Sequence, residues 1–137
     1  MNSLDADFVN CLDEVDWLCS TNNVYECPES LGGYTKGTRQ TYTVKAKFGL
    51  ASEMEIFGSY SGNADGSKVF DLYNDESTTD RIKYRGTSAQ NWWFRSPLWS
   101  SVYSERYTRS SGSAGHYNAV YSCGAVPVCR ISRTVKE

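Results

Sequence analysis

Apolar residues near the start of the chain follow first a helical and then an alternating pattern. Helical spacing over residues 4–12, behind Ser3 as an N-cap, predicts a short first helix. Over residues 15–20 apolar and polar side chains alternate, which predicts a strand. The alternation returns over residues 41–50 and predicts a second strand.

The next segment carries the clearest helix boundaries. Ser52 stands before a short apolar run, and Glu55 follows three residues later, which is the spacing of a capping box. Gly58 comes directly after the run, where a helix commonly ends. The pattern therefore predicts a short helix within residues 51–58.

The C-terminal part combines two apolar strands with a polar segment between them. The aromatic cluster at residues 92–94 predicts a strand that Pro97 ends, and the apolar run at residues 125–131 predicts a last strand. Residues 98–123 hold seven of the serines and four of the ten tyrosines and have no helical period. We expect this segment to form long loops.

Length and composition agree with one domain over residues 1–137. Hydrophobic residues make up 39% of the chain, which is enough for a folded core. No apolar run reaches the ~20 residues that a membrane span needs, and the N-terminus does not resemble a signal peptide. The net charge of −2 argues against nucleic acid as a partner. We expect an α+β domain of short antiparallel strands, one or two short helices and long loops.

The residues that most often carry metal or thiol chemistry are few. Five cysteines cannot all pair within the chain, so we expect free and mostly buried thiols, with their redox state open. The single histidine, His116, and the cysteines lack zinc spacing, and a calcium-like loop starting at Ser61 has Leu72 at its final ligand position. A Cys123–His116 pair would rest on proximity in sequence alone. We therefore predict no metal, no cofactor and no enzyme activity.

Composition leaves two interpretations of residues 98–123. Tyr and Trp provide large contact areas at low entropic cost, and Ser, Gly and Asn provide adaptable hydrogen bonds, as in the paratopes of binding proteins. The alternative is a solvated serine-rich loop whose tyrosines belong to the core. Composition by itself does not choose between them.

Motifs on both sides of this segment resemble the variable proteins of diversity-generating retroelements. WWFRSP at residues 92–97 is similar to the family's WWLRSP, and GAVPVCRI at residues 124–131 is similar to its GV(R/A)P-apolar motif. Upstream, FGLASEMEIFG at residues 48–58 is similar to the family's FxLxSxxEIFG segment. The resemblance covers residues 4–132.

The resemblance implies a C-type-lectin-like fold, related to that of the formylglycine-generating enzyme, and a non-catalytic role in ligand binding. Adenine-specific mutagenic reverse transcription would rewrite residues 98–123, with a protein or another macromolecule on a target surface as the partner. The localisation implied by analogy is a virion tail or a cell surface. The implied ligand-binding residues are Trp99, Val102, Tyr103, Ser104, Arg106, Arg109, Gly115, His116, Tyr117, Asn118, Val120, Tyr121 and Cys123.

Not every residue of the segment fits such rewriting. Asn codons of the AAY type do not yield Trp or Glu, so Trp99 and Glu105 are expected to be fixed or differently encoded. Residues 110–114 are expected to be an unvaried spacer. The residues at 92–94 would anchor the sheet beneath the segment, and Arg95 would brace a neighbouring loop.

The chain departs from the family at Val126, where Arg is usual, and at Phe94, where Leu is common. Two other functions stay open. One is a thiol- or metal-dependent enzyme of the formylglycine-generating type that uses Cys123 or Cys129. The other is a carbohydrate-binding lectin, although its usual calcium-ligand motifs are missing. The ligand, the oligomeric state and the host are not determined by the sequence.

Overall fold

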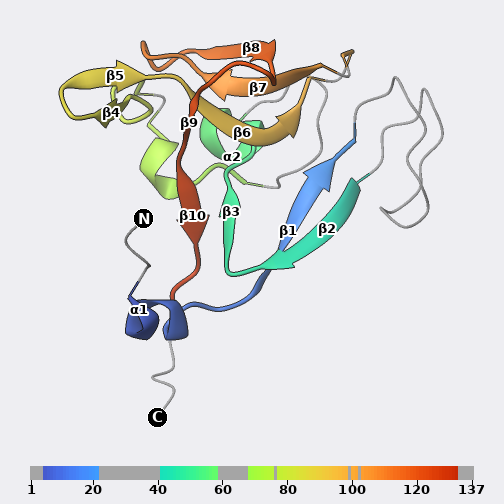
Figure 1. Ribbon diagram of the computed structural model, residues 1–137, viewed down its shortest axis with the longest axis vertical. Coiled ribbons are helices and arrows are strands. Elements are labelled where there is room, and N and C mark those ends of the chain that lie inside the picture. The colour runs from blue at the N-terminus through green and yellow to red at the C-terminus, as the bar shows by residue number, and fades with distance from the viewer. Residues whose placement is uncertain are drawn as a thin grey trace.

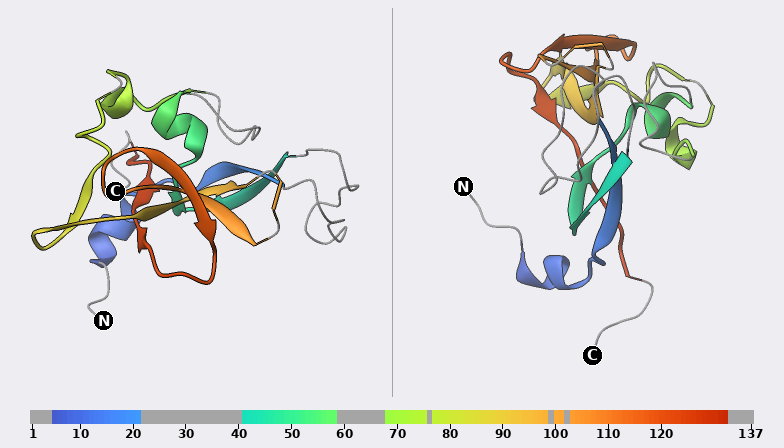
Figure 2. Two further views of the ribbon diagram at one scale, coloured as in Figure 1. Left: turned by 90° about the horizontal axis from the view of Figure 1, so that it is seen from above. Right: turned by 90° about the vertical axis from the view of Figure 1, so that its right-hand side faces the viewer.

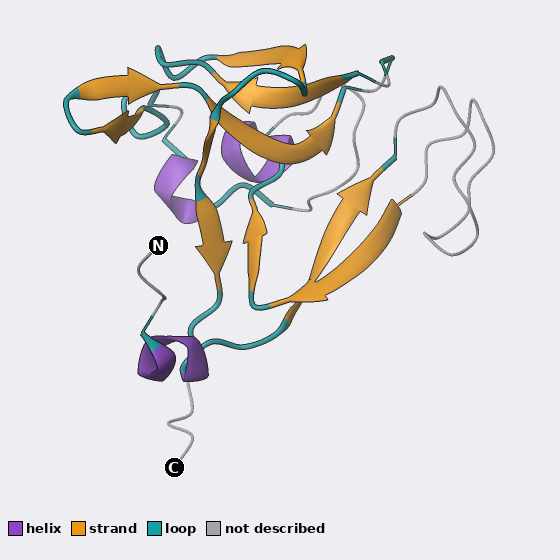
Figure 3. Ribbon diagram, in the orientation of Figure 1, coloured by secondary structure: helices purple, strands orange, loops and turns teal. Residues whose placement is uncertain are grey.

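The computed structural model describes residues 5–21, 41–58, 68–75, 77–98, 100–101 and 103–132. In these ranges the chain is mostly β, with short helices, in agreement with the expected α+β class (Figures 1 and 3). The helices are α1 (Ala6–Asn10), α2 (Glu53–Phe57) and the 3-10 helix η2 (Asp71–Tyr73). The strands are β1 (Val15–Ser20), β2 (Thr41–Ala46), β3 (Phe48–Leu50), β4 (Lys83–Arg85), β5 (Ser88–Gln90), β6 (Trp92–Pro97), β7 (Ser104–Thr108), β8 (Ala114–Asn118), β9 (Gly124–Ala125) and β10 (Pro127–Cys129).

Helix α2 forms as its sequence predicts. The Ser52 hydroxyl accepts a hydrogen bond from the Glu55 N–H at 3.2 Å, and the Glu55 carboxylate accepts one from the Ser52 N–H at 2.9 Å. This is a complete capping box. The helix ends at Gly58, which has a φ of 67° that glycine adopts without steric cost.

Helix α1 is shorter than predicted and has a different cap. The Asp5 carboxylate accepts hydrogen bonds from the Asp7 N–H at 2.8 Å and the Phe8 N–H at 3.4 Å. The prediction of Ser3 as the N-cap is therefore wrong, because a carboxylate closer to the first turn already satisfies its N–H groups. Ser3 itself lies outside the described residues.

The strand predicted over residues 41–50 is two strands. β1 forms as expected and pairs antiparallel with β2, whereas β3 pairs antiparallel with β10. The chain changes partner at Lys47, whose ammonium donates to the Val9 carbonyl at 2.9 Å. Alternation of apolar residues does not reveal such a change, because a bend at one residue leaves the period of two intact.

A four-stranded sheet in the order β8-β7-β6-β9 occupies one end of the molecule, with α1 at the opposite end (Figures 1 and 2). β6 pairs antiparallel with β7, β7 pairs antiparallel with β8, and β9 runs parallel to β6. Pro97 is the last residue of β6, as predicted. A separate hairpin of β4 and β5 leads into the sheet.

The expectation of long loops over residues 98–123 is wrong for much of this segment. Residues 104–108 and 114–118 form β7 and β8, which make an antiparallel hairpin. These strands are difficult to predict from the sequence, because both of their faces carry polar or tyrosine side chains. Apolar and polar residues therefore do not alternate along them. The diversified segment that the resemblance implies is thus held largely in a sheet.

The hydrophobic core lies between this sheet and α2. Trp92 and Phe94 of β6 are 1% and 2% exposed and pack with Ala51, Ile56 and Tyr73. The rings of Trp92 and Phe94 meet edge to face, with centroids 5.3 Å apart. We call the face of the sheet that carries these side chains the inner face, and the opposite one the outer face.

The apolar run predicted as one strand over residues 125–131 is also divided. β9 pairs with β6 of the large sheet, and β10 pairs with β3. Val126 lies between them and packs against the core. The run therefore contributes a strand to each of two sheets and packs against the core between these strands. This position explains why its side chains are apolar although the strands are short.

The cysteines are less buried than expected. Among the described residues only Cys19 is buried, Cys123 is half-buried, and Cys11 and Cys129 are exposed; Cys27 lies outside the described residues. The prediction of mostly buried thiols is thus wrong for this part of the chain, because three of these four residues lie at element ends or on solvent-facing positions.

No helix among the described residues is long and apolar enough to cross a membrane.

Candidate functional site

The register of β7 and β8 decides which face each side chain takes. Tyr107 lies opposite Trp93 of β6 and opposite Gly115 of β8, and Glu105 lies opposite Tyr117. Directly opposed residues of an antiparallel pair project from the same face. These five residues therefore share the outer face of the sheet, away from α2.

Four aromatic rings form a continuous row along this face. Successive centroids lie 5.9 Å apart from Trp93 to Tyr107, 6.0 Å from Tyr107 to Tyr117, and 4.3 Å from Tyr117 to Tyr121. Gly115 makes room for the row, since a Cβ there would lie 2.9 Å from Cε1 of Tyr107. We call these four aromatic residues the aromatic row.

The row ends in an exposed apolar surface. Tyr117 is 43% exposed, Tyr121 52% and Val120 81%. Tyr103, which is 67% exposed, joins them because the Ala119 N–H donates to the Tyr103 carbonyl at 2.7 Å. The tyrosine patch, defined as Tyr103, Tyr117, Val120 and Tyr121, lies at the open end of the β7–β8 hairpin.

The closed end of the hairpin is anchored through its backbone. Gly112 has a φ of 84°, and a Cβ there would lie 2.1 Å from the Thr78 carbonyl oxygen. The Ser110 N–H donates to the Asn91 side chain at 2.8 Å, and the Gly112 N–H donates to the Arg109 carbonyl at 2.8 Å. This turn lies within the segment expected to be an unvaried spacer, and its packing gives a physical reason for constancy there.

The inner face of the hairpin is also anchored. Arg106 is 8% exposed, and its guanidinium forms a buried ion pair with Glu53 of α2, with Nε 3.0 Å from Oε1. The backbone N–H of Glu53 donates to the hydroxyl of Ser96, which is fully buried in β6. Arg106 therefore links the hairpin to α2, and its guanidinium does not face solvent.

The thirteen residues implied as ligand-binding fall into four groups. The exposed ones are Tyr103, Arg109, His116, Tyr117, Val120 and Tyr121. The half-buried ones are Ser104, Asn118 and Cys123. Arg106 and Gly115 are buried, and both have structural contacts. Trp99 and Val102 lie outside the described residues.

Tyr107 supports the site but was not among the residues implied by the resemblance. It is 7% exposed and stands between the rings of Trp93 and Tyr117. A signal for this position does exist in the sequence, because Glu105 and Tyr107 alternate with Arg106 along β7. However, the sequence does not show which strand lies opposite β7. The alternation therefore does not show whether Arg106 faces the core or whether Glu105 and Tyr107 do.

The sequence matches the profile of one protein family, described as "Domain of unknown function (DUF6273)", over residues 2–133. The chain belongs to the DUF6273 family. No curated protein and no solved structure matches the chain.

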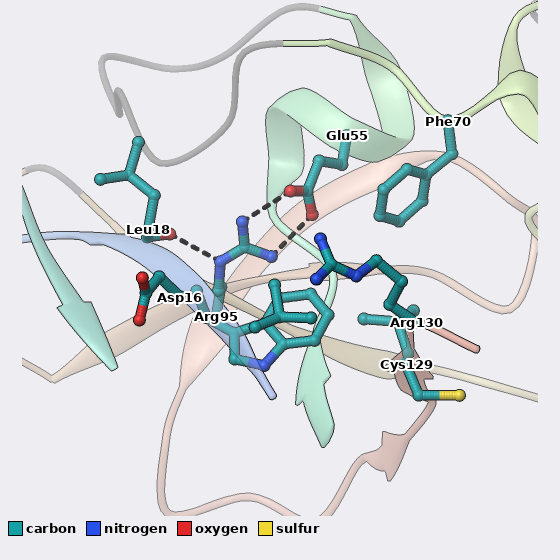
Figure 4. Close-up of a pocket in the computed structure, with 10 residues that line it drawn as sticks. Asp16, Leu18, Glu55, Phe70, Arg95, Cys129 and Arg130 are labelled. Atoms are coloured by element: carbon teal, nitrogen blue, oxygen red, sulfur yellow. Dashed lines mark hydrogen bonds and ion pairs between the residues drawn. The ribbon is translucent and has the colours of Figure 1, made fainter. Parts of the chain in front are cut away.

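Arg95 of this DUF6273 domain joins two strands and a helix, and not the loop that was expected (Figure 4). Its guanidinium binds both carboxylate oxygens of Glu55 in α2, at 2.6 Å and 2.7 Å. It also donates to the carbonyls of Leu18 in β1 and Leu50 in β3, each at 2.7 Å. Burial of this pair makes it a structural connection between the sheets and α2.

Cys123 of the DUF6273 domain lies directly before β9, at the end of residues 98–123. Its surroundings include Lys83 and Arg85 of β4, which line the same small cavity. Burial raises the pKa of the Cys123 thiol, so the thiol stays protonated at neutral pH. This is the reverse of the environment that activates a cysteine nucleophile.

Proposed function

We propose that this DUF6273 domain is a non-catalytic recognition protein whose residues 98–123 form a ligand-binding surface. The observation that carries the proposal is the tyrosine patch: four large side chains, each at least 43% exposed, gathered at one end of a firmly anchored hairpin. A folded domain gains nothing in its own stability from leaving such a cluster in water.

The anchoring of the hairpin supports this proposal independently of the composition. Its closed end packs on the Thr78 carbonyl, and its inner face carries the Arg106–Glu53 pair. The backbone of β7 and β8 is therefore held by contacts that do not involve the tyrosine patch. Side chains on the patch can change without removing those contacts, which is what a diversified binding surface requires.

The chemistry of the patch favours a protein or another macromolecule as the ligand. Tyr side chains are frequent binding hot spots, and a buried aromatic anchor contributes about 2 kcal/mol or more to affinity. Arg109 is exposed beside the aromatic row, since a Cβ at Gly115 would lie 3.2 Å from its Nε, whereas His116 lies opposite Arg106 and projects from the other face. An apolar patch with a polar group beside it resembles the apolar core and polar rim of a protein interface.

The same proposal includes a C-type-lectin-like fold, diversification of residues 98–123 by a retroelement, and display on a virion tail or cell surface. The motifs at residues 92–97 and 124–131 support it. In the structure the first motif forms β6 and the second forms the β9–β10 segment, and β6 pairs with β9. Both strands thus lie on the β7 side of the hairpin, within the same sheet.

The thiol-enzyme alternative receives less support from the site. Burial raises the pKa of Cys123, and in Figure 4 the sulfur of Cys129 points away from the cavity beside it. The two thiols also line different cavities. Cys123 therefore lacks the lowered pKa of an activated nucleophile, and the sulfur of Cys129 lacks the geometry of one directed at a bound substrate.

A pair of matched libraries tests the binding function. One randomises the tyrosine patch, and the other randomises four exposed apolar residues elsewhere on the surface: Tyr42, Val44, Leu72 and Tyr84. Both are displayed and selected against the same set of unrelated proteins. We expect specific binders mainly from the first library. Equal yields from both, or a first library that is mostly unfolded, would overturn the proposal.

The encoding DNA tests the diversification separately. We expect a nearby template repeat that is almost identical to the codons for residues 98–123 and differs from them only at adenines. If the repeat differs at other bases as often as at adenines, or if no repeat exists, diversification is refuted. The binding function would then still be decided by the two libraries.

A further inference from the structure

We propose that the domain has a second binding site, a cavity beside β1 that takes a small amphipathic carboxylate. The cavity has a volume of about 610 Å³ and is lined by residues of β1, α2, β6 and β10, with Phe70 from the segment before η2 (Figure 4). This volume lies within the range of small-molecule sites. No lining residue belongs to residues 98–123, so this inference does not rest on the proposed function.

One wall of the cavity is already held in place. The indole N–H of Trp17 donates to the Ala46 carbonyl at 3.0 Å, and the Arg95 guanidinium lies 5.6 Å from the Trp17 ring centroid. The ring also lies against Gly49, where a Cβ would be only 2.6 Å from Cδ2 of the indole. Because the ring is fixed from several sides, a ligand would not have to order it.

Apolar groups make up most of the lining. Trp17 and Val15 come from β1, Val128 from β10, and Phe70 from the loop before η2. Phe70 and Val128 also pack against the hydrophobic core, which holds these side chains in position. The cavity can therefore take the apolar body of a ligand, such as a phenyl ring or a short acyl chain.

The charged groups at the base of the cavity already satisfy one another. Glu55 accepts two hydrogen bonds from the Arg95 guanidinium and a further one from the Ser52 N–H. The side chains of Arg95 and Glu55 are 9% and 13% exposed. Because the two charges compensate each other, this part of the cavity has almost no net charge. The Arg95–Glu55 pair therefore does not favour either an anionic or a cationic ligand.

Arg130 provides the group that selects the ligand charge. Its Nε pairs with Asp13 at 3.1 Å, while its two terminal nitrogens have no partner among the described residues. Arg130 lines the cavity, and in Figure 4 its guanidinium points in the direction of Glu55 and Phe70, whereas the Asp16 carboxylate points away. Two terminal NH2 groups in a planar fork match the two oxygens of a carboxylate. The site thus combines an apolar cavity with one carboxylate-binding cation.

An NMR titration of the whole domain with hydrocinnamate, a phenyl ring on a short carboxylate chain, tests the site. We expect saturable shifts of the Trp17 indole N–H and the Val128 methyl groups. The indole signal of Trp93, which lies on the outer face of the sheet, should not move. Hydrocinnamide has the same body without the charge, and we expect it to bind about tenfold more weakly.

Two arginine variants test whether Arg130 is the cation that binds the ligand carboxylate. Arg130→Gln should weaken hydrocinnamate binding about tenfold, whereas Arg85→Gln, at an exposed arginine that does not line this cavity, should leave it unchanged. The absence of saturable shifts, equal binding of acid and amide, or equal effects of both variants would overturn the proposal. If Arg130→Gln does not fold, the comparison of acid and amide still decides the question. None of these outcomes affects the library test of the tyrosine patch.

Discussion

The two faces of the four-stranded sheet use similar residues in opposite ways. On the inner face, Trp92 is 1% exposed within the core and Arg106 is paired with Glu53. On the outer face, Trp93 begins a row of rings that ends at Tyr121, which is half exposed. An aromatic side chain is structural on one face and available for contact on the other.

This difference shows how a scaffold can tolerate changes over one surface. The inner face makes contacts that depend on particular atoms, such as the edge-to-face packing of Trp92 on Phe94. The rings of the outer face stack mainly on one another, and their exposure rises from Tyr107 through Tyr117 to Tyr121. Exchanging a side chain at the exposed end removes few contacts, so we expect the cost in stability to fall from Tyr107 to Tyr121.

The comparison is tested most strongly by truncating the two adjacent tryptophans. Trp92→Ala should lower the free energy of unfolding by about 4 kcal/mol, because it leaves a large cavity in the core. Trp93→Ala should cost about 1–2 kcal/mol, because its ring is only half-buried. Urea unfolding of both variants measures the difference, and equal losses would contradict the assignment of the two faces.

The buried ion pair gives the next largest effect. Arg106→Ala should cost about 3 kcal/mol, since it leaves the Glu53 carboxylate buried without this partner. Arg109→Ala, at an exposed arginine on the same hairpin, should change stability by less than about 0.5 kcal/mol. Thermal unfolding compares the two variants. If they behave alike, Arg106 is not an anchor and belongs with the binding surface.

A smaller effect is expected at Gly115, where the aromatic row crosses β8. Gly115→Ala should cost about 1–2 kcal/mol, because the new Cβ would lie 2.9 Å from the Tyr107 ring. Combining it with Tyr107→Ala removes that clash, so the double variant should lose less than the sum of the single losses. Additive losses in this double-mutant cycle would show that Gly115 has another role.

The smallest effects should come from the tyrosine patch. Tyr103→Ala and Tyr121→Ala should each change the free energy of unfolding by less than about 1 kcal/mol, because both side chains are more than half exposed. The same variants should reduce binding in any clone selected from the patch library. A loss of stability as large as that of Trp92→Ala would place these tyrosines in the core and refute the binding surface.

Local signals in the sequence predicted several elements well. Helix α2 has the capping box and the glycine end that Ser52, Glu55 and Gly58 indicate. Pro97 ends β6, and Arg95 does connect neighbouring parts of the chain, although these are β1, β3 and α2 and not the loop that was expected. These features depend on neighbouring residues or on a single strongly directional side chain, so they can be recognised without knowing the fold.

Pairing between distant strands was much harder to predict. The strands β7 and β8 have no clear apolar face, and the run over residues 41–50 changes partner at Lys47. The candidate site was therefore predicted as a segment but not as a surface. Of the thirteen implied residues, Arg106 and Gly115 proved to be buried, and Tyr107 was not recognised as the ring that supports Tyr117.

The amino-acid sequence by itself determined the short-range features of this protein: the capping box and glycine end of α2, its apolar strands, and the unusual composition of residues 98–123. Only the tertiary structure decided which face each residue of β7 and β8 takes. The reason is that a strand's two faces differ only through what covers them. Here α2 covers the inner face and pairs with Arg106, so the neighbouring tyrosines project outward.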